Sequence, residues 1–365
     1  MGFEARTIFP GVLLEGAERV AKHSASNETA TRADLIQEMG WGATLICEKK
    51  GGYGGSFKDI GSLMEGLASR AINLPIDTRC CIVPGMLQAA PASDSVEALL
   101  SAIAEGTASV EWAGPLSWRQ SDELPELSPT AQGWRIDGRL ENIEWTDCCS
   151  HVLFCAINTT TQTHCVVVAD ASCLPAPARA FTTVDQRSVK QFELAAMELD
   201  RDSILAQGDA ALAMSRAGWK LAQVSVGTQI VCTMNYALSE TVPYLQERKQ
   251  FGQPLAQLQV LRHEVAKLYV IFETCKSLLM ATLRSTEDSG DDSANRAAYD
   301  LLGVYVREQA VVFAQAVIQL HGGMGMALET LAARMASRLI AYAFRFGDTY
   351  SHTKALTRFQ AGLEQ

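Results

Sequence analysis

Cysteine and histidine side chains, which are common zinc ligands, lie close together in CCSHVLFC (Cys148–Cys155). This stretch can be interpreted as a metal cluster. From His151 onward, however, the residues alternate as they do in a half-buried strand. The ten cysteines include no CxxC pair. We therefore predict a structural strand here and no metal site.

Three glycines stand between two helical patterns in QLHGGMGMALET (Gln319–Thr330). A helix needs only one glycine to end. Gly322, Gly323 and Gly325 therefore supply more backbone freedom than termination requires. A plain turn between helices is one explanation, and the glycines alone do not decide whether they have a further role.

A second polar stretch is YLQERKQFGQPLAQLQ (Tyr244–Gln259). Arg248 and Lys249 end a long helical pattern. Gly252 and Pro254 form the turn, and Gln259 lies on the next helix. Basic residues at the end of a helix interact favourably with its dipole, so an ordinary turn explains this stretch when it is taken alone.

Composition limits the classes of partner. The chain has 365 residues, 48% of them hydrophobic and 20% charged, as in an ordinary globular protein with a large core. A net charge of −10 argues against nucleic acid or an anionic membrane as the main partner. No apolar run reaches spanning length without polar interruption. The start shows no secretory signal, so we expect reduced thiols and a cytoplasmic protein.

The periodicity changes twice along the chain. Helical spacing dominates residues 1–106, strand-like segments such as SHVLFCAIN and HCVVVAD fill residues 107–205, and long helical segments fill residues 206–365. One of these has a single apolar face, marked by Val265, Leu268, Tyr269, Phe272, Leu279 and Leu283. We predict an α+β fold with an N-terminal helical domain, a middle β-barrel or sandwich domain and a C-terminal four-helix-type bundle.

Together the two polar stretches resemble the acyl-CoA dehydrogenase family of flavoproteins. That family has an R-x-x-F-G element followed by a Gln, and a Q-x-x-G-G-x-G element before the last helices. Residues 39–69, MGWGATLICEKKGGYGGSFKDIGSLMEGLAS, are similar to its N-terminal G-W…GG-x-G-x-S…E segment. The resemblance covers nearly the whole chain.

The resemblance implies an FAD that lies across a subunit interface. Arg248 would donate a forked, charged contact to the pyrophosphate. Gln259 and Gln319 would form hydrogen bonds nearby, and the missing Cβ atoms of Gly322 and Gly323 would let the main chain approach the dinucleotide. The implied cofactor-binding residues are Arg248, Phe251, Gln259, Gln319, Gly322 and Gly323.

The catalytic base of the family is absent from its usual position. Most members remove the α-proton of the acyl thioester with the glutamate of a Y-E-G-T element. Counting from Arg338 brings Phe346, Gly347, Asp348 and Thr349 onto that element, so Gly347 stands at the catalytic position. Other members place the base upstream, where GWKLAQVSVGTQIVC holds no acid. Asp348 is either a surrogate base or an exposed turn aspartate, and its shift by one residue favours the second interpretation.

The middle domain also departs from the family. Its loop GPLSWRQSDELPELS (Gly114–Ser128) lacks the central glycine of the T-E-P-x-A-G-S-D type, and ENIEWTDCC places Trp145 and Thr146 out of register with W-I-T. The bundle half of a FAD site is therefore kept, whereas the flavin-ring half and the base are not.

A heteromeric enzyme reconciles these observations. A homologous chain would supply the base, flavin cradle and acyl pocket, and this chain would supply the adenine-end contacts in trans within a heterotetramer. Family members of this kind act on bulky acyl-CoA thioesters, including steroid-derived ones, and electron-transferring flavoprotein is the implied acceptor. Two alternatives remain: a self-sufficient homo-oligomer that uses Asp348 or another base, and a non-catalytic assembly protein on the same fold.

Overall fold

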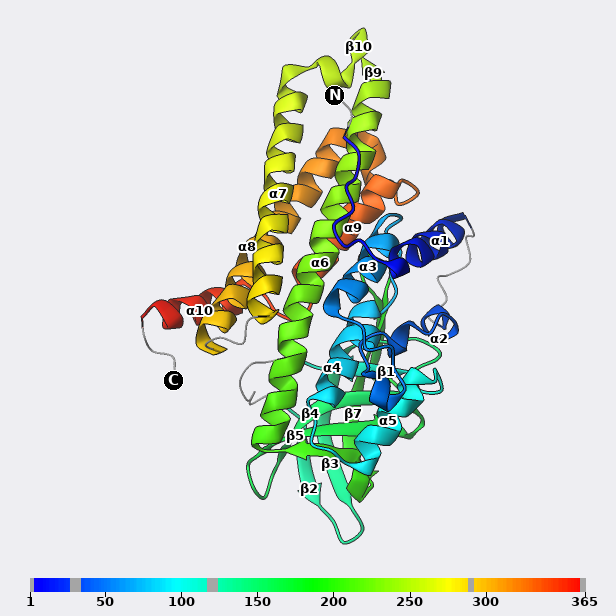
Figure 1. The fold of residues 1–365 in the computed structure, drawn as a ribbon, viewed down its shortest axis with the longest axis vertical. Coiled ribbons are helices and arrows are strands. Elements are labelled where there is room, and N and C mark those ends of the chain that lie inside the picture. Colours follow the sequence, from blue (N-terminus) through cyan, green and yellow to red (C-terminus); the bar gives the residue numbers. More distant parts are fainter. Residues whose placement is uncertain (1–2, 27–33, 117–123, 288–291, 362–365) are drawn as a thin grey trace. The chain divides into compact units, whose positions relative to one another are not determined.

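The computed structural model describes residues 3–26, 34–116, 124–287 and 292–361. The chain forms two compact units, each built from segments that are far apart in sequence. One unit contains residues 1–30, 61–73 and 223–365, and the other contains residues 31–60 and 74–222 (Figure 1). Each unit is considered separately below.

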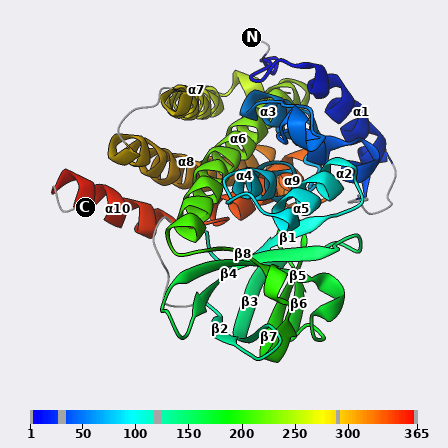
Figure 2. The ribbon, with the colours of Figure 1, turned by 60° about the horizontal axis from the view of Figure 1, so that its bottom comes forward.

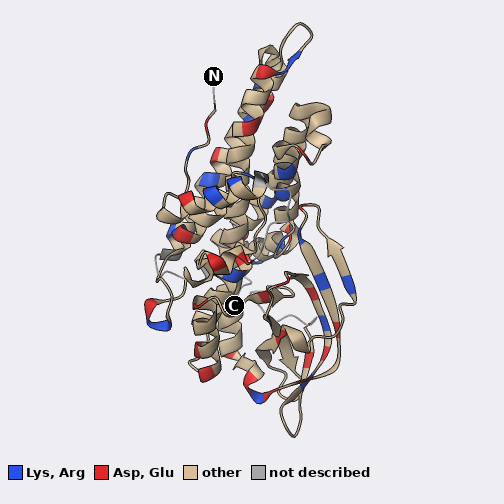
Figure 3. Cartoon of the chain, turned by 90° about the vertical axis from the view of Figure 1, so that its right-hand side faces the viewer, with Lys and Arg blue, Asp and Glu red and all other residues tan. Residues whose placement is uncertain are grey.

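The unit of residues 31–60 and 74–222 is built on an eight-stranded sheet in the order β6-β7-β3-β2-β4-β5-β8, with β1 paired in parallel to β4 (Figure 2). Buried side chains such as Phe154, Val167 and Phe192 form its apolar core. Charges of both signs lie along the strands (Figure 3), as in the Arg139–Glu193 pair at 2.7 Å. The strands are β1 (Val110–Ala113), β2 (Glu126–Pro129), β3 (Trp134–Glu144), β4 (His151–Asn158), β5 (His164–Asp170), β6 (Arg179–Thr182), β7 (Ser188–Leu199) and β8 (Ile204–Gln207).

The same unit contains short helices and a glycine-rich loop at residues 51–55. Loop amides from Gly51 to Gly55 donate to carbonyls within residues 43–48, so these amides are already used by the fold. The helical segments are α2 (Leu35–Glu38), η1 (Trp41–Ala43), η2 (Glu48–Lys50), η3 (Asp77–Ile82), α4 (Val83–Gln88), α5 (Asp94–Ala104), η4 (Ala171–Cys173) and η5 (Arg201–Ser203).

The other unit is a helical bundle. Its long helix α6 begins in the sheet unit and carries buried amides that bind buried arginines. Gln223 accepts from Arg307 at 2.8 Å, and Gln229 accepts from Arg338 at 2.5 Å. The bundle contains α1 (Val12–Ser26), part of α3 (Phe57–Ala68) and of α6 (Asp209–Glu247), β9 (Lys249–Gln250), β10 (Gln253–Pro254), η6 (Leu255–Gln257), α7 (Gln259–Glu287), α8 (Asp292–His321), η7 (Gly322–Met326), α9 (Leu331–Ala343) and α10 (Thr349–Gln360).

The α+β plan predicted from periodicity is confirmed, with strands beginning at Val110 and long helices beginning at Asp209. The predicted face of α7 is correct for Leu268, Phe272 and Leu279, which are buried. Tyr269 is 40% exposed, because α7 buries only a narrow stripe, and its ring meets Phe3 edge-on instead. The three-domain division at residues 106 and 205 stays a prediction.

Helix α8 and the turn after it (Asn295–Met326) are long and apolar enough to pass for a membrane span by length and composition, despite the polar residues within them. Among the described residues no other helix meets that test. In the bundle, Arg307 in the middle of α8 is buried and bonded to neighbouring helices, as in the core helix of a globular protein.

Candidate functional site

A tight hairpin follows α6 and carries the exposed Arg248. The main-chain N–H of Arg248 donates to the main-chain carbonyl of Tyr244 at 2.9 Å, and the carbonyl of Arg248 accepts from the main-chain N–H of Leu255 at 2.9 Å. The backbone is thus fixed while the guanidinium side chain remains exposed. A charged group held in this way is suited to bind an anion from outside the chain.

The two-residue turn of this hairpin, Phe251–Gly252, has positive φ at both positions, 52° and 79°. This geometry matches the right-handed twist of the paired strands. Phenylalanine rarely adopts a positive φ, and a conformation of this kind costs about 1–3 kcal/mol. The ring is nevertheless 85% exposed, so packing within the chain does not explain why an aromatic residue stands here.

The structural requirement for glycine differs among the three glycines that follow α8. Gly322 has a φ of +60°, which favours glycine. A Cβ on Gly325 would lie 2.5 Å from the carbonyl oxygen of Ile318, so close packing requires glycine there. Gly323 meets neither condition: its φ is not positive, and, apart from its two chain neighbours, no atom of the described residues lies within 4 Å of the position of its Cβ. The fold of this chain alone therefore does not require glycine at 323.

A contact between α6 and α8 brings the two polar stretches to the same end of the bundle. The Tyr244 hydroxyl donates to the His321 carbonyl at 3.1 Å, and the two rings stack with centroids 4.4 Å apart. His321 Nδ1 lies 2.9 Å from the Val317 carbonyl, so we assign the hydrogen to Nδ1. Burial lowers the pKa of His321, and the ring is neutral near pH 7. Gln319, two residues before His321, and Gln259, at the start of α7, are both exposed.

The loop at the position of the family's base contains no suitable base. Gly347 has a φ of +130°, which favours glycine over any residue with a side chain. The carboxylate of Asp348 caps α10 by accepting the Ser351 N–H at 2.7 Å. This hydrogen bond lowers the pKa of Asp348 below its usual value. Asp348 is therefore an exposed, weakly basic capping residue.

Arg307, which the sequence analysis did not identify, fixes this loop. Its Nη1 donates to the carbonyls of Tyr342 and Ala343 at 3.3 Å and of Arg345 at 2.8 Å, which lie at the C-terminal end of α9, where carbonyls lack a further turn of helix. Its Nη2 donates to Gln223, whose own amide donates to the Phe346 carbonyl at 3.3 Å. Burial lowers the pKa of Arg307 to about 10, so it stays charged. An arginine within an apolar helical run was the signal that could have identified it.

A buried His–Asp pair lies next to Gly347. It was not predicted from the sequence either. His352 Nδ1 lies 2.7 Å from Asp300 Oδ1, and both side chains are buried. A Cβ on Gly347 would lie 3.4 Å from His352 Nε2. The space next to Gly347 is thus partly filled by an imidazole, and the two partners are 52 residues apart in sequence.

In the sheet unit, the residues near the family's flavin-ring position are engaged by their neighbours. Thr146 Oγ1 accepts from the Arg79 guanidinium, which also forms a buried ion pair with Glu111 at 2.5 Å. Trp145 packs against Phe192 with centroids 5.2 Å apart, and Lys190 lies 4.2 Å from its ring centre. Residues 117–123 of the loop Gly114–Ser128 lie outside the described residues.

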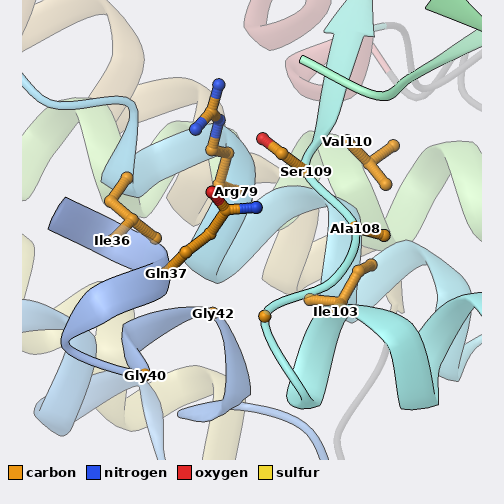
Figure 4. A pocket seen from close by; sticks show the side chains of 10 residues that line it. Ile36, Gln37, Gly40, Gly42, Arg79, Ile103, Ala108, Ser109 and Val110 are labelled. Carbon is orange, nitrogen blue, oxygen red and sulfur yellow. The ribbon is translucent and has the colours of Figure 1, made fainter. Parts of the chain in front are cut away.

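A small cavity beside Arg79 is lined by Gln37, Ser109 and the glycines at 40, 42 and 106 (Figure 4). Its volume is about 20 Å³, enough for a water molecule and far too small for a flavin ring. The Oγ of Ser109 is buried and has no hydrogen-bond partner in the protein. An internal water at this position would satisfy it.

The prediction of a strand from His151 onward is confirmed, because His151–Asn158 form β4. The strand is not half-buried as the alternation indicated: six of its eight residues are buried, because both of its faces are covered. Cys155 Sγ lies 3.2 Å from His164 Nε2 and 3.3 Å from Ser215 Oγ. Burial raises the pKa of Cys155 to about 12 and lowers that of His164. Both groups are therefore neutral near pH 7, and a neutral buried thiol is a poor nucleophile.

Comparison with known proteins finds that the C-terminal part of the chain is similar to acyl-CoA dehydrogenases. The model of the acyl-CoA dehydrogenase C-terminal domain matches residues 210–359. Acyl-CoA dehydrogenase FadE28 of Mycobacterium tuberculosis is 37% identical over 94 residues, which are 25% of this chain and 26% of that protein. The chain spans about a quarter to a third of the length of the curated relatives it matches.

Two solved structures resemble the whole chain. The ChsE4-ChsE5 complex from Mycobacterium tuberculosis matches with a TM-score of 0.82 and 15% identity, over 99% of this chain and 100% of that chain. A variant of the Tcur3481-Tcur3483 steroid ACAD matches with a TM-score of 0.79 and 18% identity, over 96% and 97%. At these identities the likeness concerns the fold.

Proposed function

We propose that this chain is one subunit of an FAD-dependent acyl-CoA dehydrogenase, because residues 210–359 match the model of the acyl-CoA dehydrogenase C-terminal domain and the whole chain resembles solved structures of that fold. In this role it contributes contacts to the adenine and pyrophosphate end of an FAD whose ring lies in a homologous partner chain. The complex introduces an α,β-double bond into an acyl-CoA thioester.

The residues at the end of the bundle fit such a cofactor. Gly323 carries the proposal: among the residues that the structure describes, none beyond its chain neighbours occupies the space where its Cβ would lie, and its φ does not need glycine. A glycine that the fold does not require is explained by a group from outside that approaches the main chain. The exposed Phe251 ring in a costly conformation points to the same kind of external contact.

Each polar residue has a role that its chemistry suits. Arg248 donates two parallel hydrogen bonds to the pyrophosphate oxygens. Gln259 and Gln319 provide neutral donors and acceptors for the ribose and adenine. The face of Phe251 offers a surface for the adenine ring. When bound, FAD supplies the hydride acceptor of the reaction.

The base belongs to the partner chain in this proposal. Asp348 has a lowered pKa and is committed to capping α10, whereas a general base works best with a pKa near the operating pH. Gly347 has no side chain to accept a proton. The buried Arg79–Glu111 pair and the packing of Trp145 on Phe192 engage residues near the expected flavin-ring position, and the cavity beside Arg79 is too small for a flavin ring. These observations support a division of labour between two homologous chains.

Three finer features are part of the same proposal. A bulky, steroid-derived acyl group is supported by the steroid ACAD among the structural relatives. A heteromeric assembly is supported by the two-chain complexes with this fold. Electron-transferring flavoprotein as the electron acceptor and the cytoplasm as the location follow from the family resemblance and from the composition.

Co-expression tests the proposal. The probe is a neighbouring chain, defined as an acyl-CoA dehydrogenase-family protein encoded beside this one and carrying the Y-E-G-T glutamate. Each chain is purified alone and together, and bound FAD is quantified by absorbance after denaturation. We expect this chain alone to hold almost no FAD and the pair to hold FAD and to desaturate acyl-CoA. Full FAD occupancy and activity in this chain alone would contradict the proposal.

A further inference from the structure

The two adjacent cysteines before β4 have different surroundings. Cys148 and Cys149 are both half-buried free thiols. The Cys149 thiol donates to the main-chain carbonyl of His151 at 3.4 Å, and burial raises the pKa of Cys149 to about 12. Cys149 is therefore a neutral thiol near pH 7. The sulfur of Cys148 is in contact with a charged group instead.

The charged group is the guanidinium of Arg79, which lies on the π-helix η3, a rare helical form that is frequent at functional sites. Its Nη1 donates to Cys148 Sγ at 3.1 Å, whereas its Nε donates to Glu111 at 2.6 Å. Thr146 Oγ1, which accepts from Nη2 of Arg79, lies 3.5 Å from the same sulfur. A guanidinium stabilises negative charge on a sulfur that it contacts, and the thiolate is the reactive form of cysteine. Reactive cysteines are found in such partly exposed positions beside a cation.

The polar cavity beside Arg79 is a second, independent indication of a small ligand. Ser109, which is 3% exposed, points its hydroxyl toward the guanidinium in this cavity (Figure 4). Among the described residues, Ser109 Oγ has no hydrogen-bond partner. With a volume of about 20 Å³, the cavity admits only very small polar molecules. Hydrogen peroxide belongs to this class, and it donates and accepts hydrogen bonds as water does.

We propose that Cys148 is an oxidation site for small hydroperoxides, which are held beside Arg79. The thiolate sulfur attacks one peroxide oxygen, the O–O bond breaks, and the leaving hydroxide takes a proton from solvent to form water. Cys148 becomes a sulfenic acid, so its sulfur is oxidised by two electrons and the peroxide is reduced by the same two. Arg79 and Thr146 are placed to form hydrogen bonds with the new oxygen. The site goes beyond the proposed function, because it needs neither FAD nor the partner chain.

Cys149 does not resolve this sulfenic acid. Consecutive Cα atoms are about 3.8 Å apart, whereas disulfides usually span about 4.4–6.8 Å, and the Cys149 thiol is bonded to the His151 carbonyl. A low-molecular-weight thiol from solution therefore restores Cys148. It attacks the Cys148 sulfur, releases water and forms a mixed disulfide, which a second molecule of the thiol reduces to free Cys148 and a free disulfide. Cys148 is thus a reversible redox site.

Peroxide oxidation of the full chain tests the site. The reduced chain is treated with hydrogen peroxide and with dimedone, which labels sulfenic acids, and the labelled fraction of each cysteine is followed by peptide mass spectrometry. Cys173, which is exposed, and Cys47, which is half-buried like Cys148, are the internal controls. We expect Cys148 to be labelled at least about ten-fold faster than either control. Labelling of Cys173 as fast as that of Cys148 would mean that exposure alone governs the reaction, and would overturn the proposal.

Two variants separate the role of Arg79 from that of the cavity. Arg79→Gln combined with Glu111→Gln replaces the ion pair by two amides, so that no buried charge is left alone. This double variant should slow the labelling of Cys148 about ten-fold and leave that of Cys173 unchanged. Ser109→Ala removes the cavity hydroxyl and keeps the contact between Arg79 and Cys148. It should slow oxidation by peroxide several-fold and leave alkylation of Cys148 by iodoacetamide unchanged. Oxidation at the wild-type rate in either variant, with folding verified by circular dichroism, contradicts the proposal, and Ser109→Ala decides it alone if the double variant does not fold.

Discussion

The hydroxyl of Tyr244 donates to the carbonyl of His321 at 3.1 Å, and the two rings stack. These residues are 77 positions apart, and each lies within one turn of a proposed cofactor contact. Tyr244 precedes Arg248 by one helical turn, and His321 lies between Gln319 and Gly323. The contact therefore fixes the relative position of the two stretches that were recognised separately in the sequence.

Tyr244→Phe should lower the free energy of unfolding by about 0.5–1.5 kcal/mol, because it removes one partly buried hydrogen bond and keeps the ring stack. It should also weaken FAD binding by the complex several-fold, since the two polar stretches lose a common support. Urea denaturation and FAD titration measure the two effects. Tyr350→Phe, at a tyrosine 73% exposed, is the control. Equal effects of the two substitutions would mean that the Tyr244 contact has no special role.

His321 should make the stability of the chain depend on pH. Its folded pKa lies below the ordinary value of 6.5 because the ring is buried, so the unfolded chain binds the proton more readily. Stability is then fully present above pH 6.5 and falls as the pH drops from 6.5 toward the folded pKa. Each such histidine contributes a slope of up to about 1.4 kcal/mol per pH unit, and His164 adds to the same trend. His321→Phe should make the unfolding free energy depend less steeply on pH between pH 6.5 and pH 5. An unchanged slope in that range would show that His321 does not titrate in this way.

Arg248→Ala should separate cofactor binding from folding. The side chain is exposed, so the unfolding free energy should change by less than about 0.5 kcal/mol. Loss of a charge-assisted contact should weaken FAD binding to the complex by about 1.5–3 kcal/mol, roughly 10- to 100-fold. Arg248→Lys should recover part of the affinity, since lysine keeps the charge without the fork. Lys249→Ala is the control at the adjacent residue. If it lowers the affinity for FAD as much as Arg248→Ala does, Arg248 acts only through its positive charge and makes no specific contact.

Local patterns predicted much of the fold. Changes of period placed the strands within residues 107–205 and the long helices after them, and the strands lie between Val110 and Gln207. Burial of one face imposes such a period on each element. Gly252 and Pro254 indicated a turn. Gly252 lies in it together with Phe251, both with positive φ, whereas Pro254 lies in the short strand β10. For α7, the pattern predicted a buried face that is too wide, because it included Tyr269, which is exposed. No local signal shows how much of a helix its neighbours cover.

The site was predictable only in part. Gly347 in place of an acid was visible by counting along the chain. The Arg307 clamp joins α8 to the end of α9, and the His352–Asp300 pair joins residues 52 positions apart. Such contacts depend on tertiary packing, so one sequence contains only a hint of them, namely a charge placed within an apolar run. The distinct reasons for Gly322, Gly323 and Gly325 likewise appear only when the surroundings of each Cβ are known.

Asp348→Asn should leave the activity of the assembled complex almost unchanged. Asparagine caps a helix about as well as aspartate, so α10 keeps its N-terminal hydrogen bond and the structure is preserved. If Asp348 were the base, the same change would reduce the rate by about 10²–10⁴-fold. Asp348→Ala separates the structural role, with an expected loss of about 1 kcal/mol in unfolding free energy. A large loss of rate in an Asp348→Asn complex that still holds FAD would make the self-sufficient enzyme the better explanation.

Gly347→Glu should fail to create a working base, although it restores the residue type at the position where the family carries its acid. The backbone at 347 has a φ of +130°, which any side chain adopts only with strain of about 1–3 kcal/mol. The new Cβ would lie 3.4 Å from His352 Nε2, and the Arg307 and Gln223 contacts hold the preceding carbonyls. We therefore expect Gly347→Glu and Gly347→Ala to lower the unfolding free energy by similar amounts, because the same backbone strain destabilises both variants and neither side chain gains a favourable contact.

The activity of the Gly347→Glu variant is tested on the isolated chain, supplied with FAD and acyl-CoA. It should show no bleaching of flavin absorbance near 450 nm, roughly the flavin band that disappears when the cofactor accepts the hydride. Bleaching that depends on acyl-CoA in this variant, and not in Gly347→Ala, would show instead that the chain retains an intact flavin and acyl pocket and lacks only the acid.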